Sequence, residues 1–72
     1  MNEDEKAKLK TILNYWVKHN EEHSQEFKEW AEKARASEES EVGDQISQAA
    51  EVMEKVNDLL LQAMNKLQGR ES

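Results

Sequence analysis

The sequence predicts an all-α fold, an antiparallel hairpin of two helices over about residues 3–36 and 40–68. The chain of 72 residues contains no proline and only two glycines, the residues that most often interrupt helices. Apolar residues recur at steps of three and four in two separate stretches, which indicates that each helix packs against another. A chain of this length forms one domain, residues 1–72.

The first helix is expected to begin after Asn2. The Asn2 side chain can accept a hydrogen bond from the backbone of Glu5 while the Glu5 carboxylate reaches back, which is the capping-box arrangement. The acidic residues at positions 3–5 also suit the positive end of the helix dipole. The apolar seam of this helix then runs unbroken to about residue 36, and its members are Leu9, Leu13, Trp16, Asn20, His23, Phe27, Trp30 and Ala34.

Three aromatic residues of this seam, Trp16, Phe27 and Trp30, are expected to anchor the core. A buried aromatic side chain removes roughly 150–250 Å² from water. These side chains therefore dominate the predicted contact between the two helices.

Residues 36–41 lose the apolar pattern and carry serines that can cap a helix, so they predict the turn. The second helix is expected to end before Gly69, which suits a C-terminal cap. Gly43 lowers helix propensity by about 1 kcal/mol relative to alanine, so the first turn of this helix is expected to be frayed or shifted. The members of the second seam are Val42, Ile46, Ala49, Met53, Val56, Leu60, Ala63 and Leu67.

The two seams have equal lengths, so folding the chain back pairs positions whose numbers sum to about 76. Asn20 then lies almost opposite Asn57, and we expect the two amides to be in contact. His23, one turn away, is expected to join them in a polar seam cluster. Buried amides of this kind fix helix register. The alternative is that Asn20, His23 and Asn57 form a polar ligand pocket.

The second helix is more apolar than one partner helix requires, because Ala50, Val52, Leu59 and Leu61 widen its stripe. The hairpin is therefore expected to dimerise into a four-helix bundle. The alternative is a three-helix bundle with a break near Asn20, where a capping residue precedes two acids. The seam passes through position 20 without a change of phase, which favours the unbroken helix.

A possible divalent-metal site is suggested by the histidines, His19 and His23, which are four residues apart and share one side of the helix. Glu26 lies on the same flank and completes a candidate set of three ligands. A zinc-protease motif is excluded because residue 20, after the first histidine, is asparagine and not glutamate. No nucleophile triad or glycine-rich phosphate loop can be assembled, so we do not expect an enzyme.

Charge and composition narrow the classes of partner. The net charge is -6, with ten basic residues scattered among sixteen acids, which disfavours nucleic acid and anionic membranes. The chain has no cysteine and no apolar run of transmembrane length, and its acidic N-terminus is unlike a secretory signal. We therefore expect a cytoplasmic, non-enzymatic interaction or oligomerisation module that binds itself or a partner protein. The alternative function is divalent-metal binding or sensing through His19, His23 and Glu26.

The middle of the first helix resembles a group of small uncharacterised prokaryotic helical domains. The similar string is Trp16-x-x-His19-Asn20-Glu21-Glu22-His23-x-x-x-Phe27-x-x-Trp30-Ala31. The resemblance implies that His19, Asn20, His23, Phe27 and Trp30 belong to one shared feature.

Overall fold

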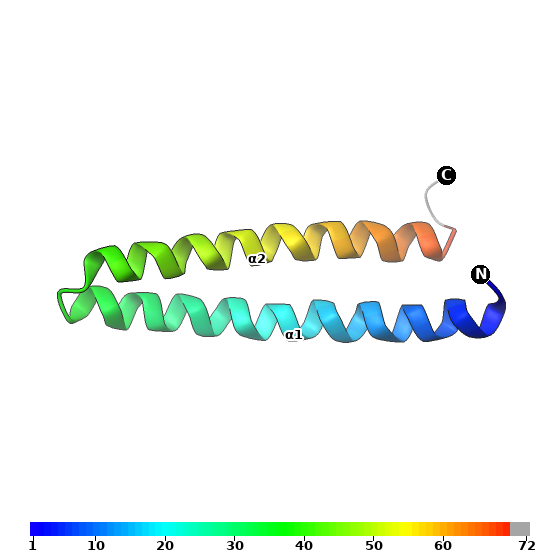
Figure 1. Cartoon of the computed structure of the whole chain (residues 1–72), viewed down its shortest axis with the longest axis horizontal. Helices are drawn as coiled ribbons and strands as arrows, with labels where there is room; N and C mark the ends of the chain where they lie inside the picture. The colour runs from blue at the N-terminus through cyan, green and yellow to red at the C-terminus, as the bar shows by residue number, and fades with distance from the viewer. Residues whose placement is uncertain (70–72) are drawn as a thin grey trace.

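The structure, a computed structural model, describes residues 1–69, which form two helices, α1 (Glu3–Ala36) and α2 (Ser40–Leu67). The helices lie side by side and antiparallel, so the fold is the predicted hairpin (Figure 1). Helix α1 is continuous through Asn20, so the alternative three-helix bundle is wrong. The last three residues of the domain expected over 1–72 lie outside the described residues. Within the described residues, neither helix is long and apolar enough to span a membrane.

The start of α1 is held by the predicted capping box. The backbone N–H of Glu5 donates to Asn2 Oδ1 over 2.8 Å, and the backbone N–H of Asn2 donates to the Glu5 carboxylate over 3.4 Å. The capping box thus provides hydrogen-bond partners for two backbone N–H groups at the start of α1 that have no partner within the helix.

The turn between the helices is a Schellman motif. The N–H of Glu39 donates to the carbonyl of Ala34 over 2.8 Å, and that of Glu38 donates to Arg35 over 3.1 Å. This motif requires a left-handed residue, and Glu38 takes that role with a φ of 68°. The N-cap of α2 is Glu39, whose side chain makes no capping hydrogen bond, so the serines of the turn are not the expected cap.

The two glycines behave differently. Gly69 follows α2 with a φ of 73° and donates its N–H to the Lys66 carbonyl, as expected for a C-terminal cap. Gly43 is buried within α2, so the frayed first turn expected there is not observed. An added Cβ at Gly43 would lie 2.8 Å from the carbonyl oxygen of Ala31. The glycine therefore allows the two helices to approach closely.

The register of the hairpin is as predicted. Asn20 Nδ2 donates to Asn57 Oδ1 over 3.0 Å, and Asn57 Nδ2 donates to the Val17 carbonyl over 3.0 Å. Asn57 is only 7% exposed, so both hydrogen bonds belong to the interior of the seam. A third polar link, from Ser24 Oγ to the Ala50 carbonyl, spans 3.5 Å.

The seam itself differs from the prediction. Trp16 is 45% exposed and Trp30 is 60% exposed, so neither is a core anchor, whereas Phe27 is half-buried. Half of the expected seam positions remain in the seam, and the other half are replaced by the next residue in the chain, so each helix is rotated by about 50° relative to the expected seam. The buried or half-buried residues that line the observed seam are Leu13, Val17, Asn20, Ser24, Phe27, Ala31 and Ala34 of α1, and Gly43, Ile46, Ala50, Met53, Asn57, Leu60, Met64 and Leu67 of α2.

Small side chains explain the rotation. Ser24, Ala31, Gly43 and Ala50 are all buried, and they let the backbones approach in a way that two tryptophans at the same level would prevent. Three hydrogen bonds cross the seam, from amide to amide, from amide to backbone carbonyl and from hydroxyl to backbone carbonyl. These short side chains reach their partners only because the two backbones lie close together. The larger side chains are consequently displaced to the flanks of the seam.

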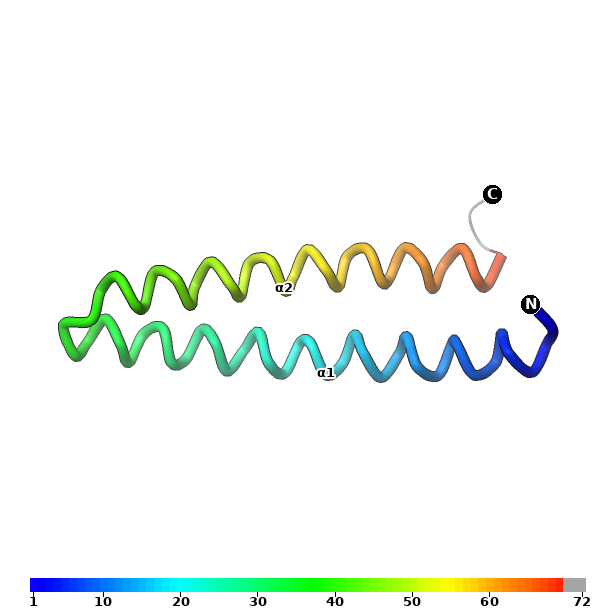
Figure 2. Tube along the Cα trace, in the orientation of Figure 1, coloured from blue at the N-terminus to red at the C-terminus, as the bar shows by residue number. Residues whose placement is uncertain are grey.

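The hairpin is a single layer of helices. Its extents are 53 × 22 × 13 Å, and α2 lies beside α1 along its whole length, while the N-terminal end of α1 extends beyond it (Figure 2). Its radius of gyration is 16.2 Å, whereas a compact domain of this length has about 11 Å. Globular domains normally pack at least two layers around a core. Each broad face of this layer is therefore uncovered in the isolated chain.

Candidate functional site

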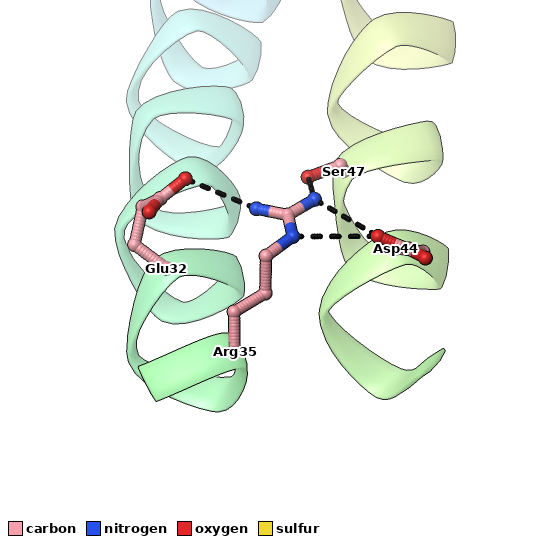
Figure 3. A network of polar contacts seen from close by, with 4 residues as sticks. All are labelled: Glu32, Arg35, Asp44 and Ser47. Carbon is pink, nitrogen blue, oxygen red and sulfur yellow. Dashed lines mark hydrogen bonds and ion pairs between the residues drawn. The ribbon is translucent and has the colours of Figure 1, made fainter. Parts of the chain in front are cut away.

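The two broad faces of the hairpin differ in chemistry, and the cross-helix ion pairs identify the polar one. Lys28 pairs with Glu54, and Arg35 pairs with Asp44 at 3.3 Å. The Arg35 guanidinium also donates to Ser47 over 2.7 Å (Figure 3). These residues define what we call the polar face.

The position of these ion pairs also locates the opposite face. Lys28 and Arg35 directly follow the seam residues Phe27 and Ala34, and Glu54 directly follows Met53. Because the helices are antiparallel, the residues that directly follow these seam positions lie on the same side of the hairpin in both helices. The residues that directly precede the remaining seam positions lie on the opposite side.

The opposite side is what we call the apolar face. Its inner positions precede seam residues and recur every seven residues, and its outer positions lie one turn further out. The apolar face consists of Ile12, Trp16, His19, His23 and Trp30 of α1, and Val42, Ala49, Val52, Val56, Leu59 and Ala63 of α2. The same outer positions also carry Glu26, Lys33, Gln45 and Lys66, so this face is apolar along its centre, apart from His23, and partly charged along its edges.

The apolar face is open to solvent. Leu59 is 65% exposed, Val52 58% and Val42 49%, in addition to the two tryptophans. The Lys33 ammonium lies 4.2 Å from the centre of the Trp30 ring, a cation–π contact at the edge of the face. Contiguous apolar surface of this kind marks interaction sites in soluble proteins.

Charged side chains on the polar face already form ion pairs between the two helices. Glu54 lies beside Lys28, whose hydrogen bond and then whose charge lower the pKa of the Glu54 carboxyl from its usual 4.5. Arg35 bridges Glu32 on its own helix and Asp44 on the other (Figure 3). The ion pairs of the polar face therefore join α1 to α2 within one chain.

The candidate metal ligands lie on the apolar face but do not converge as a set of three. His19 Nε2 and His23 Nε2 are 2.9 Å apart, whereas Glu26 lies on the far side of the His23 ring, 3.4 Å from Nδ1. One ion cannot bind both nitrogens of the same ring. Among residues 1–69 no group of three or more His, Cys, Asp or Glu side chains could hold a metal ion. The three-ligand set expected from the sequence is therefore not assembled.

The expected polar seam cluster is present only in part. Asn20 and Asn57 are joined as described, but His23 faces His19 and stacks toward Phe27, with ring centroids 6.1 Å apart. No buried side-chain nitrogen or oxygen of the described residues lacks a hydrogen-bond partner. The amide pair therefore fixes the register of the two helices and does not form an open ligand pocket.

Sequence reasoning missed two features, one of the surface and one of the seam. The cross-helix pairing of Lys28 with Glu54 could have been found from the register, because both residues directly follow seam residues on facing helices. The small residues Ser24 and Ala50 also carried a signal, since they recur with Ala31 and Gly43 at seven-residue spacing.

The fold and its surface define a class: an antiparallel two-helix hairpin with one polar face fastened by ion pairs and one exposed apolar face. A family model described as "Domain of unknown function (DUF8180)" matches residues 9–67, which include most of both helices. The chain belongs to this family. Comparisons with curated proteins and with solved structures gave no match.

Proposed function

We propose that this protein is a non-enzymatic self-association module, in which the apolar faces of two copies pack together as a four-helix bundle. The observation that carries the proposal is the segregation of the two faces. One face is fastened by ion pairs within the chain, and the other presents tryptophan, leucine and valine side chains to solvent.

The exposed area supports this proposal. The chain exposes 5675 Å², whereas a compact monomer of 8.4 kDa exposes about 4,600 Å². The excess of about 1,000 Å² is comparable to the roughly 800 Å² that each partner contributes to a standard interface. A second copy supplies enough surface to cover the apolar face.

The thin core also supports association. The only buried hydrophobic residues among residues 1–69 are Leu13, Val17, Ala31 and Ala50, and no large side chain is fully buried. A small domain rarely gains more than about 3–5 kcal/mol from one core, even when that core is well filled. A second layer of helices provides the burial that this seam lacks.

A second copy is a better fit than an unrelated partner because the face is self-complementary. The α1 half carries large side chains, Trp16 and Trp30, whereas the α2 half carries smaller ones such as Ala49, Val56 and Ala63. A two-fold axis that lies in the interface parallel to the helices brings the large half of one copy onto the small half of the other. The acidic groups of the polar face then remain in water.

The test is a matched pair of substitutions two residues apart on α2. Leu59 belongs to the apolar face and Leu61 to the polar face, with exposures of 65% and 42%. We expect the wild type to sediment at twice the 8.4 kDa chain mass and its melting temperature to rise with protein concentration. Leu59→Glu should give a monomer, because a carboxylate would be buried at the interface. Leu61→Glu should leave the dimer intact.

Two results would overturn the proposal. One is a wild-type chain that stays monomeric at high micromolar concentration, with a melting temperature independent of concentration. The other is a dimer that Leu61→Glu dissociates as strongly as Leu59→Glu does.

A further inference from the structure

The two histidines bring their Nε2 atoms together, and one of these nitrogens donates a hydrogen bond to the other. A metal ion bound by both nitrogens replaces this hydrogen bond and displaces its proton. His19 and His23 lie one turn apart on α1, and their Nε2 atoms approach to 2.9 Å. The rings are nearly perpendicular, with an interplanar angle of 84°. Both rings belong to the apolar face, where water or an ion can reach them.

The separation of the nitrogens fits two adjacent ligands of one metal ion. Imidazole nitrogens bind transition metals at about 2.0–2.1 Å, so two ligands at a right angle are about 2.9 Å apart. A tetrahedral angle would require about 3.3 Å. Right-angled nitrogen ligands are typical of the tetragonal ions Cu²⁺ and Ni²⁺.

Glu26 has a role other than that of a ligand. Its carboxylate lies 3.4 Å from His23 Nδ1, where it favours a proton on that nitrogen and leaves the lone pair on Nε2. Metal-binding histidines are commonly oriented by a carboxylate in this way. Tyr15 stacks on His19, with ring centroids 5.4 Å apart and an interplanar angle of 17°, and so restrains the second ring.

We propose that His19 and His23 form a bidentate site for a tetragonal divalent cation, Cu²⁺ or Ni²⁺, with Glu26 as the positioning residue of His23. Water completes the coordination. Both ligands come from one helix of one chain, but they lie on the face that a second copy would cover, so metal binding and self-association compete for this surface. The site replaces the three-ligand set expected from the sequence with two ligands and one supporting carboxylate.

The test is calorimetric titration with NiCl₂ of the full-length wild type and of the full-length Leu59→Glu variant, in which the apolar face should be uncovered. We expect saturable binding at one ion per chain, lost in His19→Ala and in His23→Ala. Far-UV circular dichroism of each variant verifies that the helices are retained.

A matched pair of variants separates the role of Glu26 from its charge. Glu26→Gln should weaken nickel binding about 10–100-fold, the usual effect of losing a supporting carboxylate. Glu21→Gln removes an equal charge from the same helix on the side of Lys28 and Glu54, and should leave affinity within about twofold of wild type. Nickel binding that survives both histidine substitutions would overturn the site. Equal affinities for Glu26→Gln and Glu21→Gln would overturn the assignment of Glu26.

Discussion

Replacing Gly43 with alanine tests how closely the two helices approach. In an exposed helix interior, alanine is more stable than glycine by about 1 kcal/mol. At Gly43 an added Cβ would lie 2.8 Å from the carbonyl oxygen of Ala31 and 2.8 Å from Cγ of Arg35. The first of these atoms is backbone, so the helices must separate locally. Overpacking of this kind costs about 1–3 kcal/mol, which outweighs the gain in helix propensity. We expect Gly43→Ala to lower the free energy of unfolding by about 1 kcal/mol.

The assay is urea unfolding followed by circular dichroism, at one fixed protein concentration so that association contributes equally. Gln48 on α2 is exposed and provides the control for helix propensity. There, Gln48→Ala should be more stable than Gln48→Gly by about 1 kcal/mol. If alanine stabilises position 43 by the same amount as position 48, the close approach at Gly43 is refuted.

Three further predictions concern the turn, the seam and the polar face. Glu38→Gly should stabilise the protein by about 0.5–1 kcal/mol in urea unfolding, because Glu38 has a φ of 68° that glycine adopts without strain. Asn57→Ala should destabilise it by about 2 kcal/mol through two lost hydrogen bonds, and a double-mutant cycle with Asn20→Ala should give a coupling of about 1 kcal/mol. Lys28→Met should raise the pKa of Glu54 toward 4.5 in an NMR titration, because Lys28 holds that pKa down by hydrogen bonding and charge. Since the folded pKa is the lower one, the pair stabilises the fold above about pH 4.5, and its contribution is lost as pH falls through the folded pKa.

Each of these predictions has a contrary outcome. Glu39 has a φ of -104°, so equal stabilisation by Glu39→Gly would show that relief of the left-handed conformation is not the cause. Additive effects of the two asparagine substitutions would contradict the direct amide contact. A Glu54 pKa that does not change in Lys28→Met would contradict the cross-helix pair.

The register could be predicted because it depends on counting. Both seams span equal lengths on either side of one short turn, so Asn20 and Asn57 had to meet if the helices were continuous. The capping box at Asn2 and the cap at Gly69 were predictable for a similar reason, since each depends on local chemistry. Continuity of α1 through Asn20 followed from the unbroken phase of its apolar residues.

The rotation of the helices could not be predicted from apolar periodicity alone. In each seven-residue repeat, three positions that are neighbours on the helix surface carry mostly apolar or small residues. Only two of these three positions can form the seam. Side-chain size favoured the pair containing Trp16 and Trp30, but close backbone contact favours the pair containing Ala31 and Gly43. Size and closeness of approach are competing contributions to packing, and the sequence does not rank them.

The candidate site was predictable in location but not in detail. Spacing alone placed His19, His23 and Glu26 on one flank of α1. Which ring nitrogen faces which neighbour depends on side-chain rotamers, and these set Glu26 against Nδ1 and not against Nε2. The same reasoning explains why His23 does not join the asparagines, since its ring follows the flank and not the seam.

The displacement of the tryptophans from the seam has a consequence for how such hairpins can diverge. Substitutions at Trp16, Trp30, Val42 or Val56 change the outer surface while leaving the amides and small residues between the helices untouched. After gene duplication, two descendants can therefore acquire different shapes on this surface without losing their shared hairpin. Under the proposed self-association, the choice of partner can then change without a change in folding, so that each descendant binds its own copies and not those of the other.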